Sequence, residues 1–414
     1  MRDRSGLVDM CTRAAFAFAL ATTALLGGCT GGRGSGRTTY GTVASRIENA
    51  DTNRAAGLGA VTYEVYWDRL QPFSDRFSLS QFDRARDDLA TFRDAGMQIV
   101  LDLGLQYPPS WAFTTQNSRY VNQYGDAYTD DLPGSNGLNA VFNQQVRDLQ
   151  AAYVDRVFEE LGSDFYAVRL GWGYYGELSY PGHTYADRVN AYWAFDDVAQ
   201  GLAPGLSMTL MPNPVPGWIP RTESQDHASA REFLSWYLDA LTDYQNWQIA
   251  TVRRHFDGQL AVLYPSWGVR PGQLEPAIAT DLSGLSPPEQ NGELQRGHDF
   301  ARHIASLEDR KVIAYTTWLD ASPSFGNETG DNPAGWSPAH YLAQLAEERR
   351  PALQVWGENT GSGTVDDMQL CFNRLDDYGL KGLFWAFESQ LYATANDYAS
   401  IDDYATLIDA RASS

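Results

Sequence analysis

Short apolar segments alternate with longer amphipathic ones along almost the whole chain, and this alternation constrains the fold more than any other feature of the sequence. Most of the apolar segments are continuous at their start, as expected of parallel strands that are covered on both faces. Eight of them occur from residue 38 onward: TTYGTVA, GAVTYEVYW, MQIVLDLGL, FYAVRLGWG, QLAVLYPSWG, KVIAYTTWL, ALQVWGEN and KGLFWAF.

The intervening segments have helical spacing. From residue 78 to 96, Phe82, Ala85, Leu89 and Phe92 recur at helical intervals, and Gly96 follows as a stop signal. Further helices are predicted over 139–162, 229–256 and 337–350. This pattern predicts an α/β fold, a single (β/α)8 TIM barrel spanning residues 39–414, with a two-lobed α/β protein as the alternative.

Two stretches rich in Pro, Gly, Asn and Trp interrupt the alternation. They cover residues 212–228 and 320–336, and each follows a strand-like segment. Connections of this length are usually lids or cleft walls, which is the role we expect here.

Composition narrows the classes of partner. The net charge of −21 argues against nucleic acid, because phosphates would be repelled. The 12 Trp and 23 Tyr allow two interpretations, core packing or a sugar cleft lined by flat rings. The histidines and cysteines have no metal-site spacing, so we expect neither metal nor cofactor.

The N-terminal segment has the features of an export signal. Three arginines precede a short apolar run that ends in LGGC, which resembles the bacterial lipobox. We therefore expect residues 1–28 to be a lipoprotein signal peptide, Cys29 to carry the lipid, and residues 29–38 to be a flexible tether. The expected location is the extracytoplasmic face of the cell membrane, held there by the lipid anchor. Cys371, in a helical pattern, is expected to be a buried apolar side chain.

In a barrel of this type the active site lies where strands end and the following loops begin. The predicted strand ends carry acidic, amide and aromatic side chains, a combination that suits a carbohydrate substrate. The expected substrate-binding residues are Glu64, Trp67, Asp102, Gln106, Trp111, Tyr175, Trp267, Tyr315, Trp318, Asn359, Trp385 and Glu388.

Two glutamates are the candidate catalytic pair. Glu177 follows the fourth predicted strand and Glu358 ends the seventh, and each has glycine before it, which would leave backbone room for a ligand. Glycoside hydrolysis needs two carboxyl groups, one to protonate the leaving oxygen and one to attack or to activate water. Tyr174 and Tyr175 are expected to limit hydration of Glu177 and so raise its pKa. Glu388 is either a substrate contact or a rival third carboxylate.

This layout resembles glycoside hydrolase clan A, the (β/α)8 retaining glycosidases with the acid/base on strand four and the nucleophile on strand seven. Residues 63–112, from the WDRLQP turn to the PPSW loop, are similar to the corresponding stretch of family 42 β-galactosidases. The pattern covers most of the mature chain, but sequence similarity covers only about its first hundred residues. The resemblance implies that Glu177 is the acid/base, Glu358 the nucleophile, Tyr315 a partner of the nucleophile and Trp385 the platform under the sugar.

One departure leaves the mechanism open. Clan members usually have Asn before the acid/base, and Gly176 stands there in this chain. The stretch YGELSYP is instead similar to the GEL-x-YP stretch of β-amylases, which are inverting enzymes that act on α-1,4-glucan. The alternatives are therefore an inverting β-amylase-like glycosidase, a non-catalytic sugar-binding lipoprotein, and a barrel that kept its cleft without catalysis.

Overall fold

The computed structural model describes residues 38–129, 137–171, 173, 176–203, 210–221, 225–284, 292–323, 328, 330–361, 363–393 and 397–413. Eight parallel strands close into a barrel in sequence order, with the last strand paired to the first. The (β/α)8 prediction is confirmed, and the two-lobed alternative is wrong. The strands are β1 (Thr39–Thr42), β2 (Ala60–Glu64), β3 (Gln98–Asp102), β4 (Ala167–Leu170), β5 (Gln259–Tyr264), β6 (Val312–Thr316), β7 (Gln354–Glu358) and β8 (Gly382–Trp385).

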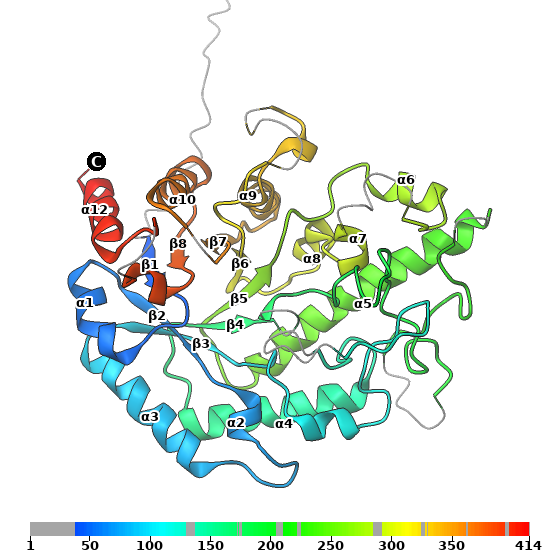
Figure 1. Ribbon diagram of the computed structural model, residues 1–414, viewed down its shortest axis with the longest axis horizontal. Helices are drawn as coiled ribbons and strands as arrows, with labels where there is room; N and C mark the ends of the chain where they lie inside the picture. Colours follow the sequence, from blue (N-terminus) through cyan, green and yellow to red (C-terminus); the bar gives the residue numbers. More distant parts are fainter. Residues whose placement is uncertain are drawn as a thin grey trace, which may run out of the picture. The chain divides into compact units, whose positions relative to one another are not determined.

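Helices surround the strands (Figure 1). The α-helices are α1 (Ala50–Ala55), α2 (Trp67–Leu70), α3 (Leu79–Asp94), α4 (Gln144–Leu161), α5 (His227–Arg253), α6 (Leu274–Ala279), α7 (Glu293–Arg296), α8 (Phe300–Ala305), α9 (Pro338–Glu348), α10 (Val365–Tyr378), α11 (Glu388–Leu391) and α12 (Ile401–Ala412). Short 3-10 helices are η1 (Ile47–Asn49), η2 (Ser110–Thr114) and η5 (Pro333–Gly335).

Three of the four predicted helices, α3, α5 and α9, begin within two residues of their predicted start, but α4 does not. It was expected from residue 139, and it begins at Gln144 because the Asn143 side chain accepts hydrogen bonds from the backbone N–H groups of Gln145 and Val146. An Asn at this position satisfies donors that have no partner within the helix, and so fixes its start. The apolar residues before Asn143 pack as irregular chain.

The barrel encloses a small apolar layer of its own. Alternate residues of a strand face opposite sides, so one set fills the barrel and the other packs on the helices. The inward set is Ala60, Val100, Ala167, Ala261, Leu263, Ile313, Tyr315, Trp356 and Phe384. This layer forms the floor beneath the polar residues at the strand ends.

The longest interruption of the alternation follows β4. Residues 171–226 connect β4 to α5, and their described part contains neither a strand nor an α-helix. This connection packs through stacked and edge-on rings, such as Tyr180 on Tyr237 at 4.0 Å between centroids. The sequence predicted an irregular stretch only from residue 212, so the connection is longer than expected.

Among the described residues, no helix is long and apolar enough to cross a membrane. Cys371 is fully buried in α10, as expected. The predicted signal peptide, lipidated Cys29 and nearly all of the tether lie outside the described residues. Their roles stay predictions.

Candidate active site

The loop that carries Glu177 is a tight turn built from glycines. Gly173 donates its N–H to the carbonyl oxygen of Glu177 over 3.0 Å, and Gly176 has a φ of +81°. A Cβ on Gly171 would lie 1.6 Å from the carbonyl oxygen of Gly176, so the chain can turn back here only with glycine. The glycines therefore set the direction in which the backbone that carries Glu177 runs after β4.

The glycines before the two glutamates make room for protein atoms rather than for ligand, which corrects the expectation from the sequence. A Cβ on Gly176 would lie 3.1 Å from Nε2 of Gln106. A Cβ on Gly357 would lie 2.8 Å from Cγ2 of Thr316. Both positions are closely packed against protein atoms.

Glu177 is buried, with 9% of its surface exposed, and accepts a 2.6 Å hydrogen bond from the Thr317 hydroxyl. Burial raises the pKa of Glu177 to about 7, against the opposing effects of Arg296 and of the Thr317 hydroxyl. The negative charge of Glu358 raises it further, and Arg169 lowers it. A carboxyl group with this pKa keeps its proton close to neutral pH, as a general acid must.

Glu358 ends β7 in a different environment. Its Oε2 accepts a 2.8 Å hydrogen bond from the Tyr315 hydroxyl and lies 3.1 Å from Nη1 of Arg169. Burial raises the pKa of Glu358, while Arg169 and Tyr315 limit the rise. The two glutamates thus form an unlike pair, because only Glu358 has a guanidinium partner in direct contact.

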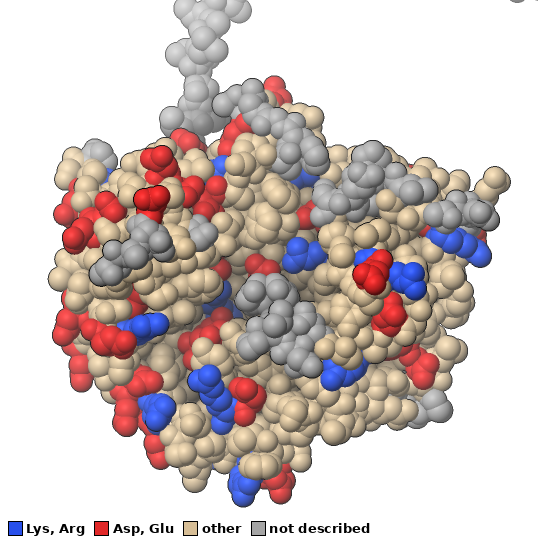
Figure 2. All heavy atoms as spheres, in the orientation of Figure 1, with Lys and Arg blue, Asp and Glu red and all other residues tan. Residues whose placement is uncertain are grey.

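Strand register explains how Arg169 reaches this position. Glu64 pairs with Asp102 across β2 and β3, and Asp102 pairs with Arg169 across β3 and β4. Glu64, Asp102 and Arg169 face into the barrel and lie further along their strands than the inward apolar residues Ala60, Val100 and Ala167. Their side chains therefore form one layer above the apolar floor. Nε of Arg169 lies 3.4 Å from Oδ2 of Asp102, so the guanidinium lies between Asp102 and Glu358. Figure 2 shows a hollow near the middle of the face drawn there, with acidic and basic side chains in it.

Gln106 links two carboxylates of this level. Its Nε2 donates to Oε1 of Glu64 over 2.8 Å and to Oδ1 of Asp102 over 3.3 Å. Burial and the charge of Asp102 raise the pKa of Glu64 to about 7. Glu64 also borders a cavity of about 320 Å³ whose lining includes Ser45 and Arg69.

The remaining rim residues differ in how they are used. Asn359 is buried and exchanges two 2.6 Å hydrogen bonds with the backbone of Ala386, so it ties the ends of β7 and β8 together. Trp267 and Trp318 are half-buried and edge-on to each other, 4.8 Å between centroids. Trp318 follows Thr317, the partner of Glu177. Tyr175 and Tyr174 lie outside the described residues.

Trp385 does not lie under a sugar, which corrects the expectation drawn from the resemblance. Phe384 faces into the barrel, so Trp385 faces the helices, where it is fully buried in the core between strands and helices. Its ring packs so closely on Gly363 that a Cβ there would lie 2.6 Å from it.

Trp67 and Glu388 also lie elsewhere than expected. Trp67 is fully buried and donates to Oε1 of Gln71, and the half-buried Trp111 donates to the Gln71 carbonyl and stands edge-on to Trp67. Glu388 is fully buried, and its carboxylate accepts four hydrogen bonds from the segment that follows β1 and from β1 itself. The fully buried Trp67 and Glu388 contribute to the protein frame, so their assignment to the substrate surface is corrected, whereas the assignment of the half-buried Trp111 stays a prediction.

Two site residues were missed by the sequence reasoning. Arg169 is the one charged residue in the apolar run FYAVRL, and a buried charge requires a partner of opposite sign. That rule could have pointed to it. Thr317 stands in YTTWL, where nothing marks it, because its role depends on a contact across the barrel.

Within the described part of the chain, no group of three or more His, Cys, Asp and Glu side chains could hold a metal ion. A larger cavity, about 690 Å³, lies at the opposite end of the barrel, where its lining includes Thr39, Gln98 and Tyr166. None of the predicted site residues borders it. The chemistry that the site offers is therefore that of two unlike carboxyl groups with an arginine and hydroxyl groups around them.

The fold, rather than the sequence, relates this chain to known proteins. No protein-family model matches the chain, and no curated protein matches it by sequence. Solved structures do match, and those described below have glycoside hydrolase barrels. At their low sequence identity, the likeness establishes the fold alone.

The catalytic domain of a β-amylase from Paenibacillus polymyxa matches with a TM-score of 0.66 and 16% identity, over 90% of this chain and 98% of that one. A β-galactosidase from Marinomonas ef1 matches with a TM-score of 0.59 and 12% identity, over 91% of this chain and 59% of that one. For a β-galactosidase from Halorubrum lacusprofundi the TM-score is 0.57 and the identity 15%, over 90% and 58%. The chain thus spans less than two thirds of either β-galactosidase.

Proposed function

We propose that this protein is a glycoside hydrolase that cleaves O-glycosidic bonds of oligo- or polysaccharides. The observation that carries the proposal is the unlike carboxyl pair on one barrel rim. Glu177 has a pKa raised to about 7, and Glu358 is held by Arg169 and Tyr315. Glycosidases need this division of roles, with one carboxyl group protonated and the other ionised.

The roles follow from the two environments. Glu177 donates its proton to the glycosidic oxygen as the bond to the sugar breaks. Glu358 attacks the anomeric carbon, and the covalent glycosyl-enzyme is then hydrolysed by water that Glu177, now ionised, deprotonates. Arg169 keeps Glu358 available as an anion, since a buried carboxylate without a cation would take up a proton.

A second mechanism is favoured by two specific observations. The stretch GELSYP surrounds the proposed acid, and the matching β-amylase domain is covered almost completely. In that alternative, Glu358 activates a water molecule, and the enzyme inverts the anomeric centre of an α-glucan. Retention requires carboxyl groups about 5–5.5 Å apart and inversion about 6.5–9.5 Å apart. NMR of the first-formed anomer on the substrate that is turned over distinguishes the two mechanisms.

Substitution of the two glutamates tests the proposal. Glu358→Gln should abolish turnover on every glycoside. Glu177→Gln should lose about 10²–10⁴-fold on unactivated sugars and much less on aryl glycosides with good leaving groups. For a retaining enzyme, added azide should restore deglycosylation in Glu177→Gln.

The matched control is Glu275→Gln, which breaks an exposed pair with Arg231 and should leave turnover unchanged. The assay is a screen of nitrophenyl glycosides and polysaccharides. Sugar binding without turnover by the wild-type protein would overturn the hydrolase proposal in favour of a binding lipoprotein. Near-normal turnover by Glu358→Gln would overturn the pairing.

We also propose that the protein is exported and anchored through lipid on Cys29. The support is the sequence alone, an LGGC motif after an apolar run. Cys29→Ser should move the protein from the membrane fraction to the soluble fraction. Absence of labelled fatty acid from the wild-type chain would contradict the proposal.

A further inference from the structure

A serine, a histidine and a glutamate form a buried chain of contacts next to the proposed acid. Oγ of Ser179 lies 3.0 Å from Nε2 of His298, and Nδ1 of His298 lies 3.0 Å from Oε2 of Glu293. All three side chains are fully buried. Ser179 is two residues beyond Glu177 in the same loop. This series of side-chain contacts therefore ends on the loop that carries the proposed acid.

The arrangement has the order of a hydrolytic triad, but it cannot act as one. A nucleophile must reach its substrate, and Ser179 has no exposed surface. Its single hydroxyl proton is also shared between two acceptors, His298 Nε2 and the Tyr180 carbonyl oxygen 2.7 Å away. The chain therefore holds backbone in place.

The protonation states in this chain are set by its contacts. Glu293 accepts hydrogen bonds from the Ser266 hydroxyl over 2.6 Å and the Gly268 N–H over 2.7 Å. Burial raises the pKa of Glu293, but His298, the Ser266 hydroxyl and Arg296 outweigh burial and lower it. An ionised Glu293 can only accept, so Nδ1 of His298 carries a proton. Burial and the charge of Arg296 lower the pKa of His298 to about 4, which leaves Nε2 free to accept from Ser179.

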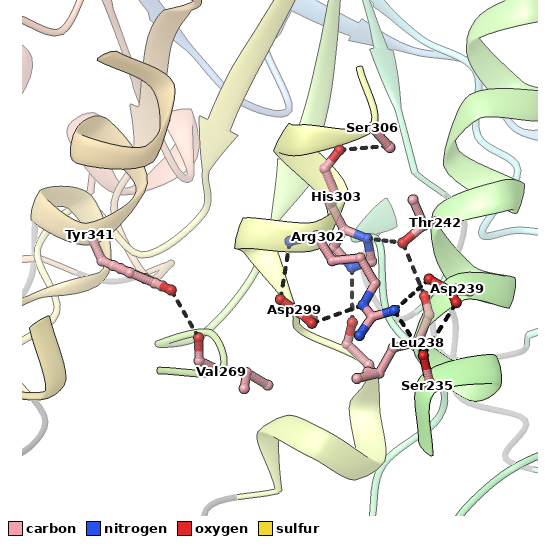
Figure 3. A network of polar contacts seen from close by, with 11 residues as sticks. Ser235, Leu238, Asp239, Thr242, Val269, Asp299, Arg302, His303, Ser306 and Tyr341 are labelled. Carbon is pink, nitrogen blue, oxygen red and sulfur yellow. Dashed lines mark hydrogen bonds and ion pairs between the residues drawn. The ribbon is translucent and has the colours of Figure 1, made fainter. Parts of the chain in front are cut away.

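His298 is followed by a group of contacts between α8 and α5, here called the base, which is drawn in Figure 3. Asp299 caps α8 and pairs with Arg302, which also contacts Asp239 of α5. His303 lies 2.8 Å from the Thr242 hydroxyl of α5. Because α8 is fixed to α5 through these contacts, His298, just before α8, has a fixed position.

The same base is joined to α9 and to the loop after β5. The Tyr341 hydroxyl donates to the carbonyl oxygen of Val269, and the Val269 N–H donates to the carbonyl oxygen of His298. His298 is thus held through its backbone as well as through its side chain.

The segment that carries His298 also supplies the cation near the acid. The Tyr180 N–H donates to the carbonyl oxygen of Arg296 over 3.0 Å, and Arg296 lowers the pKa of Glu177. The other charged groups that act on Glu177 are Glu358 and Arg169, while Glu293, Arg296 and His183 act on His298. The segment from Arg296 to His298 therefore holds the loop that carries Glu177 and also supplies a positive charge that acts on Glu177.

We infer that His298, with its tautomer set by Glu293, is a positioning residue that aims Glu177 at the leaving-group oxygen through Ser179. This inference rests on the proposed glycosidase function. It predicts that loss of the Ser179–His298 bond impairs proton donation selectively, whereas a general loss of structure would affect all substrates equally.

Ser179→Ala tests the inference, and Thr242→Val is its matched control, because each removes one buried hydroxyl bonded to an imidazole. In Ser179→Ala, kcat/KM on unactivated glycosides should fall about tenfold more than on aryl glycosides with good leaving groups. The basic limb of its pH profile should also move. Thr242→Val should change both substrates by the same factor and leave the profile in place. Equal losses in Ser179→Ala, or none, would overturn the inference.

A second variant and a second measurement keep the test independent of folding and of activity. If Ser179→Ala does not fold, His298→Gln is compared with His303→Gln in the same assays, with the same two outcomes. If the wild type turns over no glycoside, the proposed function fails, and carbon-13 NMR then follows the titration of Glu177 directly. A shifted titration in Ser179→Ala but not in Thr242→Val supports the positioning role, and an unchanged titration in both overturns it.

Discussion

The Thr317 hydroxyl lowers the pKa of the proposed acid, Glu177, and so affects how easily it loses its proton. This hydroxyl donates to Oε1 of Glu177 and so stabilises the ionised form, opposing the effect of burial. Thr317→Val removes this donor without much change in volume. The pKa of Glu177 should rise by roughly one to two units, since a hydrogen bond to a charged group contributes about 1.5–3 kcal/mol and one pKa unit is about 1.4 kcal/mol.

The sign of the effect on activity follows directly. The acid works in its protonated form, so kcat/KM of the wild type should fall as pH rises through about 7. In Thr317→Val the fall should move to higher pH. The pKa of Glu64 is also raised to about 7, so Glu64→Gln is the control and should leave the limb in place. Movement in the control alone would assign the limb to Glu64.

The two proposed catalytic glutamates could be chosen from the sequence, because strand ends on one rim of a barrel must converge. Their partners could not be chosen in the same way. Trp385 was misplaced since it lies one residue beyond the inward-facing Phe384, and a one-residue error reverses the side to which a strand residue points. Arg169 was overlooked although a buried charge in an apolar run demands a partner.

At the scale of elements, all eight strands were predicted from apolar runs, most of them continuous at their start, as expected of parallel strands buried on both faces. The connection from β4 to α5 was underestimated for a related reason. Several of its aromatic residues, such as Tyr192 and Trp193, are fully buried, so this part of the connection resembles a regular element in composition. Nothing in their spacing reveals that they pack as irregular chain onto α5.

Changes in the loop after β4 should lower activity by more than the loss of stability explains. Gly176 has a φ of +81° and Gly217 a φ of +83°, so alanine at either position should cost about 1–2 kcal/mol of stability. Only Gly176 touches the site, through Gln106. Gly176→Ala should therefore lower kcat/KM about tenfold or more, since small displacements of catalytic groups are costly.

Gly217→Ala is the matched control, because nothing lies within 4 Å of its new Cβ. Thermal unfolding and kinetics of the two variants are compared side by side. Equal activity in both variants at equal loss of stability would show that the turn does not aim Glu177.

For the whole molecule, the abundance of aromatic residues is largely a matter of packing. The largest fully buried side chains are Trp67, Trp193, Trp356, Trp385, Tyr120, Tyr153, Tyr180, Tyr192, Tyr237, Tyr244 and Tyr264. Of the two uses that composition allowed, core packing accounts for this large set. Trp267 and Trp318 remain half-buried at strand ends near the proposed acid, where rings can stack on sugars.

A buried carboxylate, that of Glu388, bridges the seam at which β8 pairs with β1. Oε1 of Glu388 accepts from the Arg46 N–H and from Asn49, and Oε2 accepts from the Thr42 hydroxyl and from Asn53. These bonds join α11, which follows β8, to β1 and the helices η1 and α1. Because the Thr42 hydroxyl and the Asn53 amide are buried, these two donors lose their partner without gaining water when the carboxylate is removed.

Glu388→Gln and Glu358→Gln should therefore have opposite signatures. Glu388→Gln turns an amide donor toward other donors, and the free energy of unfolding should fall by about 2–4 kcal/mol while kcat of the folded protein is kept. Glu358→Gln should lose kcat and keep most of its stability. Calorimetry and single-substrate kinetics on both variants measure the two quantities. If Glu388→Gln were inactive and melted like the wild type, its carboxylate would act on the substrate, and the seam would not depend on it.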